Sequence, residues 1–177
     1  MPKITVTAGH SNQDPGAVNG LFREADIAQE MRNMVAHYLR ERNIDVQTDG
    51  EGKGNLPLPA AIRLIAGSRA AVEFHCNAFP KPTAGGCEAL SQPKDRALSQ
   101  RLCQAVSGVM GIPARGNDGG WKNEGSGQHS RLGYVRNGGI ILELFFISNP
   151  AELALWQDKK WLVAKAVAAV LAEEVVK

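Results

Sequence analysis

Four polar residues stand where an apolar segment ends or is interrupted, and their types suit a metal centre. His10 ends a β-branched segment, and His75 lies near the end of the apolar run AAVEFHCN. Glu24 opens a helical pattern, and Glu143 stands in the middle of the very apolar run IILELFFI. Two His and one Glu are a common ligand set for catalytic zinc, which leaves its fourth position to water. Because burying an unpaired carboxylate is costly, Glu143 should face a polar pocket, a cation or a hydrogen-bond donor.

Each of these residues also has an ordinary structural explanation. A histidine at the end of a strand is more often a hydrogen-bonded core or edge residue than a metal ligand. An acidic residue in the first turn of a helix, such as Glu24, interacts favourably with the helix dipole. The spacing also differs from the HExxH pattern, in which one helix supplies both histidines. A zinc site therefore requires a fold that brings three separate elements to one place.

Strand-like and helix-like segments alternate along the chain, which predicts an α/β layer fold. Short apolar runs indicate strands, and apolar residues spaced three or four apart indicate helices. The predicted strands are residues 4–7, 45–48, 70–77, 86–90 and 140–147. The predicted helices are residues 24–42, 58–68 and 94–110, a helix that begins at Pro150, and a final helix over 159–175. Open α/β sheets bind ligands at the carboxyl ends of their strands, which is where His10 is expected.

Length and composition limit the possible functions. A chain of 177 residues predicts a single domain over 1–177. Twenty Lys and Arg against eighteen Asp and Glu leave a net charge of +2, which argues against a general nucleic-acid binder. Three cysteines without CxxC spacing predict buried, reduced thiols. We find neither a membrane-spanning segment nor a signal-peptide pattern, so we expect synthesis in the cytoplasm.

Three segments, in this order, resemble the zinc-dependent N-acetylmuramoyl-L-alanine amidases of the Amidase_3 family. They are residues 7–24 (TAGH, DPGA and LFRE), residues 74–78 (FHCNA) and residues 142–150 (LELFFISNP). The resemblance extends over nearly the whole chain. It implies a twisted, mostly parallel sheet of about six strands with helices on both faces. It also implies that His10, Glu24 and His75 hold one Zn²⁺ per chain and that Glu143 is the catalytic carboxylate.

The implied reaction is hydrolysis of the peptidoglycan amide bond between N-acetylmuramic acid and L-alanine. Zinc lowers the pKa of bound water to about 7, which makes hydroxide available at neutral pH. Glu143 would take a proton from this water and pass it to the leaving amine. Each ligand histidine also needs a hydrogen-bond acceptor, and Asp14 and Asn77 are near enough in sequence to be considered.

Two residues depart from the family pattern. Glu73 replaces a small residue and points to the same side as His75 by strand alternation. It either contacts the site or substrate or lies at the rim beyond the sheet, and we favour the rim. Phe145 replaces a glycine, and we expect it to narrow the pocket. Cys76 points away from His75, and we expect it to pack in the core.

A glycan strand and its stem peptide need a broad groove. The glycine-rich stretch 115–130 is long for a loop in a compact domain, and such loops are either functional or simply mobile. Arginine suits bidentate capture of the peptide carboxylates. The candidate substrate contacts are Asn77, Arg115, Trp121 and Arg136, with Lys122 and His129 as further rim residues.

Peptidoglycan is the expected partner of a monomeric enzyme that binds neither nucleic acid nor a membrane. The chain resembles a phage or prophage endolysin, which acts on the cell wall after release from the cytoplasm. A cellular enzyme freed when a mother cell lyses is a close variant. A zinc peptidase that cuts the stem peptide and a non-catalytic peptidoglycan-binding module are the alternative functions.

Overall fold

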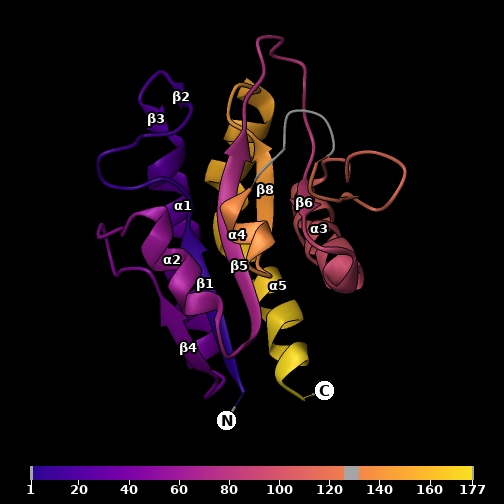
Figure 1. Cartoon of the computed structure of the whole chain (residues 1–177). Coiled ribbons are helices and arrows are strands. Elements are labelled where there is room, and N and C mark those ends of the chain that lie inside the picture. The colour runs from indigo at the N-terminus through magenta and orange to yellow at the C-terminus, as the bar shows by residue number, and fades with distance from the viewer. Residues whose placement is uncertain (1, 126–131, 177) are drawn as a thin grey trace.

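A six-stranded sheet forms the centre of the computed structural model, which describes residues 2–125 and 132–176 (Figure 1). The strands are β1 (Lys3–Ala8), β4 (Asp45–Thr48), β5 (Ser68–Asn77), β6 (Glu88–Leu90), β7 (Trp121–Lys122) and β8 (Ile140–Phe146). They are arranged in the order β4-β1-β5-β8-β6-β7. Each neighbouring pair is parallel except β6 and β8. The predicted mostly parallel α/β sheet is therefore confirmed.

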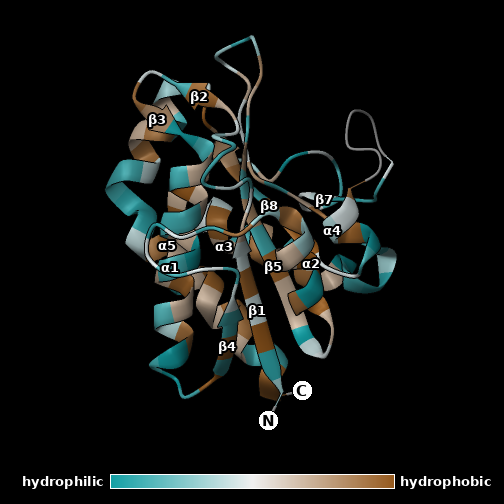
Figure 2. Cartoon of the chain, turned by 60° about the vertical axis from the view of Figure 1, so that its left-hand side comes forward, coloured by the Kyte–Doolittle hydropathy of each residue, from teal (hydrophilic) through white to brown (hydrophobic). Residues whose placement is uncertain are grey.

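Helices cover both faces of this sheet (Figure 1). One face carries α1 (Glu24–Arg40), α3 (Arg96–Met110) and α5 (Pro150–Val176). The other face carries α2 (Leu58–Ile65) and the short α4 (Gly133–Arg136). A small hairpin of β2 (Val18–Asn19) and β3 (Phe22–Arg23) leads into α1, and a 3-10 turn at Pro93–Asp95 leads into α3. Figure 2 shows hydrophilic and hydrophobic residues alternating along α1, as its sequence period predicts.

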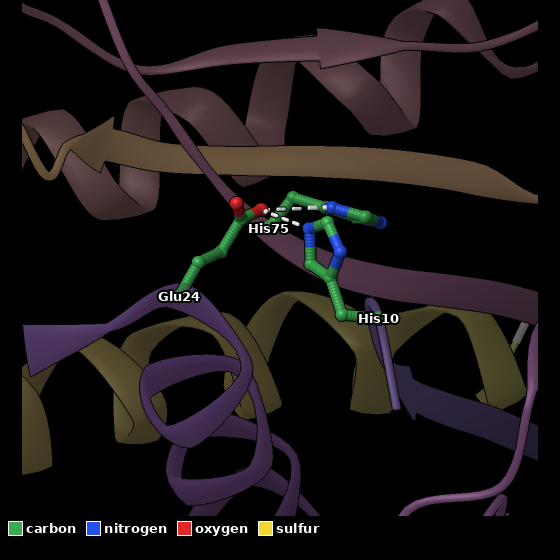
Figure 3. A group of neighbouring side chains, drawn as sticks. All are labelled: His10, Glu24 and His75. Carbon is green, nitrogen blue, oxygen red and sulfur yellow. Dashed lines mark hydrogen bonds and ion pairs between the residues drawn. The ribbon is translucent and has the colours of Figure 1, made fainter. Parts of the chain in front are cut away.

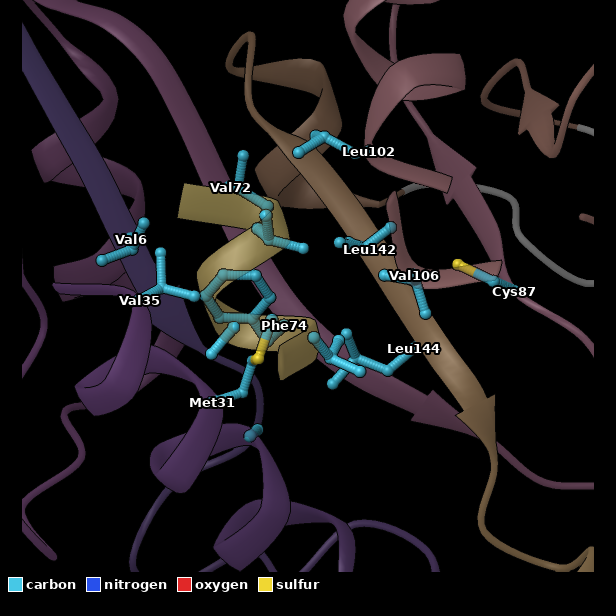
Figure 4. Close-up of a cluster of buried hydrophobic side chains, with 14 of the residues drawn as sticks. Val6, Met31, Val35, Val72, Phe74, Cys87, Leu102, Val106, Leu142 and Leu144 are labelled. Atoms are coloured by element: carbon cyan, nitrogen blue, oxygen red, sulfur yellow. The ribbon is translucent and has the colours of Figure 1, made fainter. Parts of the chain in front are cut away.

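The larger hydrophobic core lies between the sheet and the helices α1, α3 and α5 (Figure 4). Alternate side chains of the central strands point into it, and Val6, Phe74 and Leu142 are fully buried there. Met31 and Val35, four residues apart on α1, meet these side chains from the helix. Burial of each such side chain contributes about 1.5–3 kcal/mol to the free energy of unfolding. This packing fixes the positions of α1 and the central strands relative to one another.

The opposite face of the sheet carries a smaller core and the polar residues of interest. Ala71 of β5 and Ile141 of β8 face this smaller core, together with residues of α2 and α4. Glu73, His75 and Glu143 follow them at intervals of two residues, so their side chains point to the same face. The strand pattern thus separates an apolar face, which packs in the larger core, from a face that carries the candidate functional residues.

A β-bulge in β8 changes the orientation of Phe145. His75 is paired with Glu143, but Asn77 is paired with Phe146, so β8 contains one extra residue at this point. Phe145 turns into the larger core, where it is fully buried and stacks on Trp156 with ring centroids 5.6 Å apart. The expectation that Phe145 narrows the pocket is wrong, because the bulge turns its side chain away from the face of Glu143.

Other local predictions are confirmed or corrected. The two helices expected after residue 149 are one continuous helix, α5, and β5 begins at Ser68 rather than at residue 70. The elements β2, β3, β7 and α4 were not predicted, since two to four residues are too few to show a period. All three cysteines are buried and free, and Cys76 packs in the larger core as expected. In the described part of the chain, the helices lack the combined length and apolarity needed to cross a bilayer.

A buried polar network fixes the end of β1 just before the first histidine. Asp49, which follows β4, accepts hydrogen bonds from the backbone N–H of Ala8 at 3.2 Å and from Nη1 of Arg32 at 3.1 Å. Both charged side chains have no exposed surface. Burial raises the pKa of Asp49 to about 6, and the guanidinium of Arg32 opposes this rise. The network connects α1, β1 and the segment after β4.

Replacing Arg32 with Met is expected to destabilise the fold by about 3–5 kcal/mol, because it leaves a buried carboxylate without its counter-charge. The pKa of Asp49 should then rise further above its unfolded value. The loss should therefore grow as the pH rises from about 6 to about 8 and this carboxyl ionises. Urea denaturation at both pH values measures the free energy of unfolding.

Arg40→Met is the matched control on the same helix. Arg40 is about half exposed, and its Nη2 lies 3.7 Å from Oε1 of the exposed Glu51. Such a pair should contribute less than about 1 kcal/mol. Equal losses for the two variants would contradict the importance assigned to the buried ion pair.

Candidate metal centre

The first histidine stands just beyond the end of β1 in a conformation that the surrounding chain holds in place. His10 has a φ of 66°, in the left-handed region that few residues other than glycine adopt. The side-chain amide of Asn55 donates to the backbone carbonyls of residues 8–10 at 3.2–3.3 Å. Asp14 lies 2.9 Å from Nδ1 of His10, as considered from the sequence. The other ring nitrogen, Nε2, is directed at Glu24.

Glu24 is the first residue of α1, and its carboxylate faces both histidines (Figure 3). Oε1 lies 2.9 Å from Nε2 of His10 and 3.0 Å from Nδ1 of His75. The backbone N–H groups of Ala17 and Cys76 donate to Oε2 and Oε1 at 2.9 and 3.0 Å. Burial opposes the charge, but the hydrogen bonds from the two histidines outweigh it and hold the pKa of Glu24 well below its usual range. Glu24 is therefore ionised, and its carboxylate oxygens can serve as metal ligands.

His75 lies near the carboxyl end of β5, with both ring nitrogens engaged. Nδ1 faces Glu24, and Nε2 lies 3.0 Å from Oε1 of Glu73. Burial favours the neutral imidazole, but the hydrogen bonds to these two carboxylates outweigh it and raise the pKa of His75 well above its usual value. The pKa of His10 is also raised, because its bonds to Glu24 and Asp14 exceed the effect of burial. The carboxylates around the two imidazoles thus favour a positive charge between them.

Glu73 does not lie at the rim of the sheet, contrary to our expectation. It is only 3% exposed, and its backbone is paired with Thr7 on one side and Ile141 on the other. The rim interpretation fails because β5 continues to residue 77 and is paired with β1 and β8 at Glu73, which places Glu73 inside the sheet. Its carboxylate reaches the site through His75.

The donor set and the space around it fit a divalent metal ion. One ligand atom from each of His10, Glu24 and His75 lies within 4.8 Å of the other two, the only such group of His, Cys, Asp or Glu found in residues 2–125 and 132–176. A Cβ on Gly9 would lie 2.3 Å from the ring of His75, and one on Gly16 would lie 2.6 Å from the ring of His10. Both positions therefore require glycine, because any side chain would clash with a histidine ring. Two imidazoles and a carboxylate suit zinc.

Glu143 lies beside this donor set. It is paired in register with His75 across β5 and β8, and it is 8% exposed. Its Oε2 is buried and has no hydrogen-bond partner among the described residues. Burial, opposed by the positive charge of His75, raises the pKa of Glu143 to about 7. A carboxyl group with a pKa near neutrality can both accept and release a proton.

Two of the candidate substrate contacts converge on Glu88, which is paired with Glu143 across β6 and β8. Asn77 is buried and donates to Oε1 of Glu88 at 2.9 Å. It is not the acceptor for His75, because the two ring nitrogens of His75 face Glu24 and Glu73. Arg115 donates from Nε to Oε2 of Glu88 at 2.7 Å and is about one-third exposed. Nζ of Lys122 lies 2.6 Å from the same oxygen. These cations stand beside the site, and their contact with substrate remains a prediction.

The other two candidates make contacts elsewhere. Trp121 donates from Nε1 to the hydroxyl of Ser91 at 3.0 Å. Arg136 donates from Nε to Oε1 of Glu124 at 2.6 Å. His129 lies outside the described residues. A cavity of about 810 Å³ borders the β2–β3 hairpin, α1 and residues 52–53, but neither histidine nor Glu24 or Glu143 lines it. The site is therefore identified by its donor atoms and not by that cavity.

Sequence reasoning missed Arg32, Asp49 and Asn55. They support His10, but they come from α1 and from the segment after β4, and no local pattern links them. A signal was present in Arg32, a charged residue that shares a helix face with Ala28 and Val35 by i, i+4 and i, i+3 spacing. An arginine at such a position requires a buried counter-charge.

Comparisons with known proteins identify the family of the chain. The chain matches the family model described as N-acetylmuramoyl-L-alanine amidase (Amidase_3) over residues 4–173. A search of curated proteins gives no match.

Solved structures of similar fold include amidases of several bacteria. A protein from Neisseria meningitidis, put forward as an N-acetylmuramoyl-L-alanine amidase, is 52% identical, with 99% of this chain and 96% of that chain covered and a TM-score of 0.90. The catalytic domain of the amidase CwlV from Bacillus (Paenibacillus) polymyxa is 20% identical, with 99% of each chain covered and a TM-score of 0.84. The catalytic domain of the CD27L endolysin, which targets Clostridia difficile, is 20% identical, with 99% and 97% covered and a TM-score of 0.70. The last two likenesses concern the fold.

The family model leaves only a few residues at each end of the 177-residue chain unmatched. The motifs that suggested the family from the sequence alone, around His10, His75 and Glu143, lie inside the matched region. The chain belongs to the Amidase_3 family of N-acetylmuramoyl-L-alanine amidases.

Proposed function

We propose that the protein is a zinc-dependent hydrolase that cleaves the amide bond between N-acetylmuramic acid and L-alanine in peptidoglycan. Membership of the Amidase_3 family supports amidase activity. The observation that carries the zinc dependence is the meeting of His10, Glu24 and His75 beside the unpartnered carboxyl of Glu143. A peptidoglycan-binding module without catalysis would have no use for that buried carboxyl.

The three donors would hold the metal, each from a different element of the fold. His10 follows β1, Glu24 begins α1 and His75 lies on β5. When bound, zinc supplies Lewis acidity, which activates water and polarises the amide carbonyl. Asp14 and Glu73 lie on the outward ring nitrogens of the two histidines and orient the rings toward Glu24.

Glu143 would move the proton. Its pKa of about 7 lets it take a proton from the attacking water at neutral pH and return it to the leaving amine, which departs poorly unless it is protonated. No described group donates a hydrogen bond to its buried Oε2, so no protein partner competes for this oxygen. The neighbouring cations of Arg115 and Lys122 would attract the carboxylates of the stem peptide.

The biological setting belongs to the same proposal. Release from the cytoplasm onto the cell wall, an endolysin origin and a monomeric state stay predictions. The CD27L endolysin and the catalytic domain of CwlV are each 20% identical to this chain, so sequence identity to them does not favour an endolysin origin.

Glu143→Gln should lower the rate of hydrolysis by about 10²–10⁴-fold, because the amide cannot accept the proton of the attacking water. Its zinc content should stay near one ion per chain. The assay is the release of new amino termini from sacculi, identified by mass spectrometry. Alanine as the new terminus indicates an amidase, whereas another residue would indicate a peptidase. Lysis by this variant at the wild-type rate would contradict the role of Glu143 as a base.

His75→Ala should lose zinc and activity together, since it removes one of three donors. His37→Ala is the control, because His37 is exposed on α1, away from the three donors, and lies 3.5 Å from Glu41. Metal analysis of the purified proteins and hydrolysis before and after chelation give the comparison. A His75→Ala protein with unchanged zinc content would remove this residue from the ligand set.

A further inference from the structure

Glu73 is a buried carboxylate two residues before His75, and both of its oxygens have partners. Oε1 lies 3.0 Å from Nε2 of His75. Oε2 lies 3.5 Å from the hydroxyl of Thr7, which in turn lies 3.1 Å from the hydroxyl of Tyr134. All four side chains are largely or fully buried. The single hydroxyl proton of Thr7 can serve only one partner, so Tyr134 donates to Thr7 when Thr7 donates to Glu73.

The imidazole of His75 is confined to one orientation. The ring packs against the backbone of Gly9, where even a methyl group would lie 2.3–2.6 Å from three ring atoms. The ring of His10 lies across it, with centroids 5.1 Å apart and planes at 68°. With Nε2 on Glu73 and Nδ1 toward Glu24, a flip would break two hydrogen bonds inside a packed space.

The two histidines differ in the carboxylate that orients them. Asp14, beside His10, is 62% exposed at its side chain, whereas the side chain of Glu73 is 4% exposed. Water can replace an exposed carboxylate as a hydrogen-bond acceptor, but it has little access to the buried one. A charge-assisted hydrogen bond is also stronger where the surroundings are less polar. The buried partner should therefore have the larger influence on its histidine.

We propose that Glu73 is a positioning residue for the metal centre: its carboxylate keeps the proton of His75 on Nε2 and so presents the lone pair of Nδ1 to the ion. This inference rests on the proposed function, since it assigns a role toward the same metal. Thr7 contacts the second oxygen of this carboxylate, and Tyr134 contacts Thr7 in turn. Glu73 itself does not touch the reacting atoms.

The test compares zinc affinity among variants by competition with a chromophoric chelator. Glu73→Gln keeps the shape but not the charge, and it should weaken Zn²⁺ binding about 10–100-fold. Glu152→Gln is the matched control, because Glu152 is similarly buried, and among the described residues it accepts from the backbone amides of Gly86 and Phe146 rather than from a histidine. Its zinc affinity should stay within about twofold of wild type, even if stability falls. A Glu73→Gln protein that binds zinc as tightly as the control would overturn the proposal.

A second measurement does not depend on any variant. In ¹⁵N spectra of the zinc-loaded wild-type protein, the imidazole of His75 should carry its proton on Nε2. A proton on Nδ1 would overturn the proposal even if Glu73→Gln failed to fold. The proposed function fails separately: it is lost if the wild-type protein binds no zinc, whereas zinc-dependent hydrolysis with unchanged affinity in Glu73→Gln removes only the role of Glu73.

Discussion

The buried carboxylate of Glu24 is the group on which the site depends. Its charge is compensated by two imidazoles and two backbone N–H groups, and each of these partners comes from a different part of the chain from the helix that carries Glu24. Desolvating a carboxylate is expensive, so the fold is viable only if these partners arrive together. The arrangement holds three elements in contact and brings together donor atoms that a divalent cation would satisfy.

The remaining structure serves to place those partners. Hydrophobic packing under α1 positions the helix whose first residue is Glu24. Parallel pairing of β5 with β1 and β8 places His75 between the end of β1, which His10 follows, and the strand that bears Glu143. The buried pair of Arg32 and Asp49 fixes the end of β1, because Asp49 accepts hydrogen bonds from the backbone N–H of Ala8. Each contribution is structural, yet each positions a residue of the candidate metal centre.

Much of this could be predicted from the sequence, for definite reasons. The apolar composition of residues 140–146 predicts a buried strand. Burying the carboxylate of Glu143 inside it costs enough free energy to indicate a functional role. Apolar residues at helical spacing gave α1, and with it the place of Glu24. The family motifs then supplied the ligand set, which spacing alone had left open against ordinary structural explanations.

What the sequence could not show depends on contacts between distant segments. Phe145 turned to the core because of a bulge, which depends on the register between two strands and leaves no trace in composition. Glu73 was placed at the rim because the end of β5 relative to its neighbours was unknown. Asn77 was considered for His75, but it bonds to Glu88 on β6. In each case the side chain's type was read correctly, and its neighbour was set by tertiary structure.

The central claim is that His10, Glu24 and His75 converge on one metal ion. Anomalous diffraction at the zinc absorption edge, from crystals of zinc-loaded protein, tests it most directly. The account predicts one peak at about 2.0–2.2 Å from Nε2 of His10, a carboxylate oxygen of Glu24 and Nδ1 of His75. An ion bound elsewhere, with the two imidazoles directed away from each other, would contradict it.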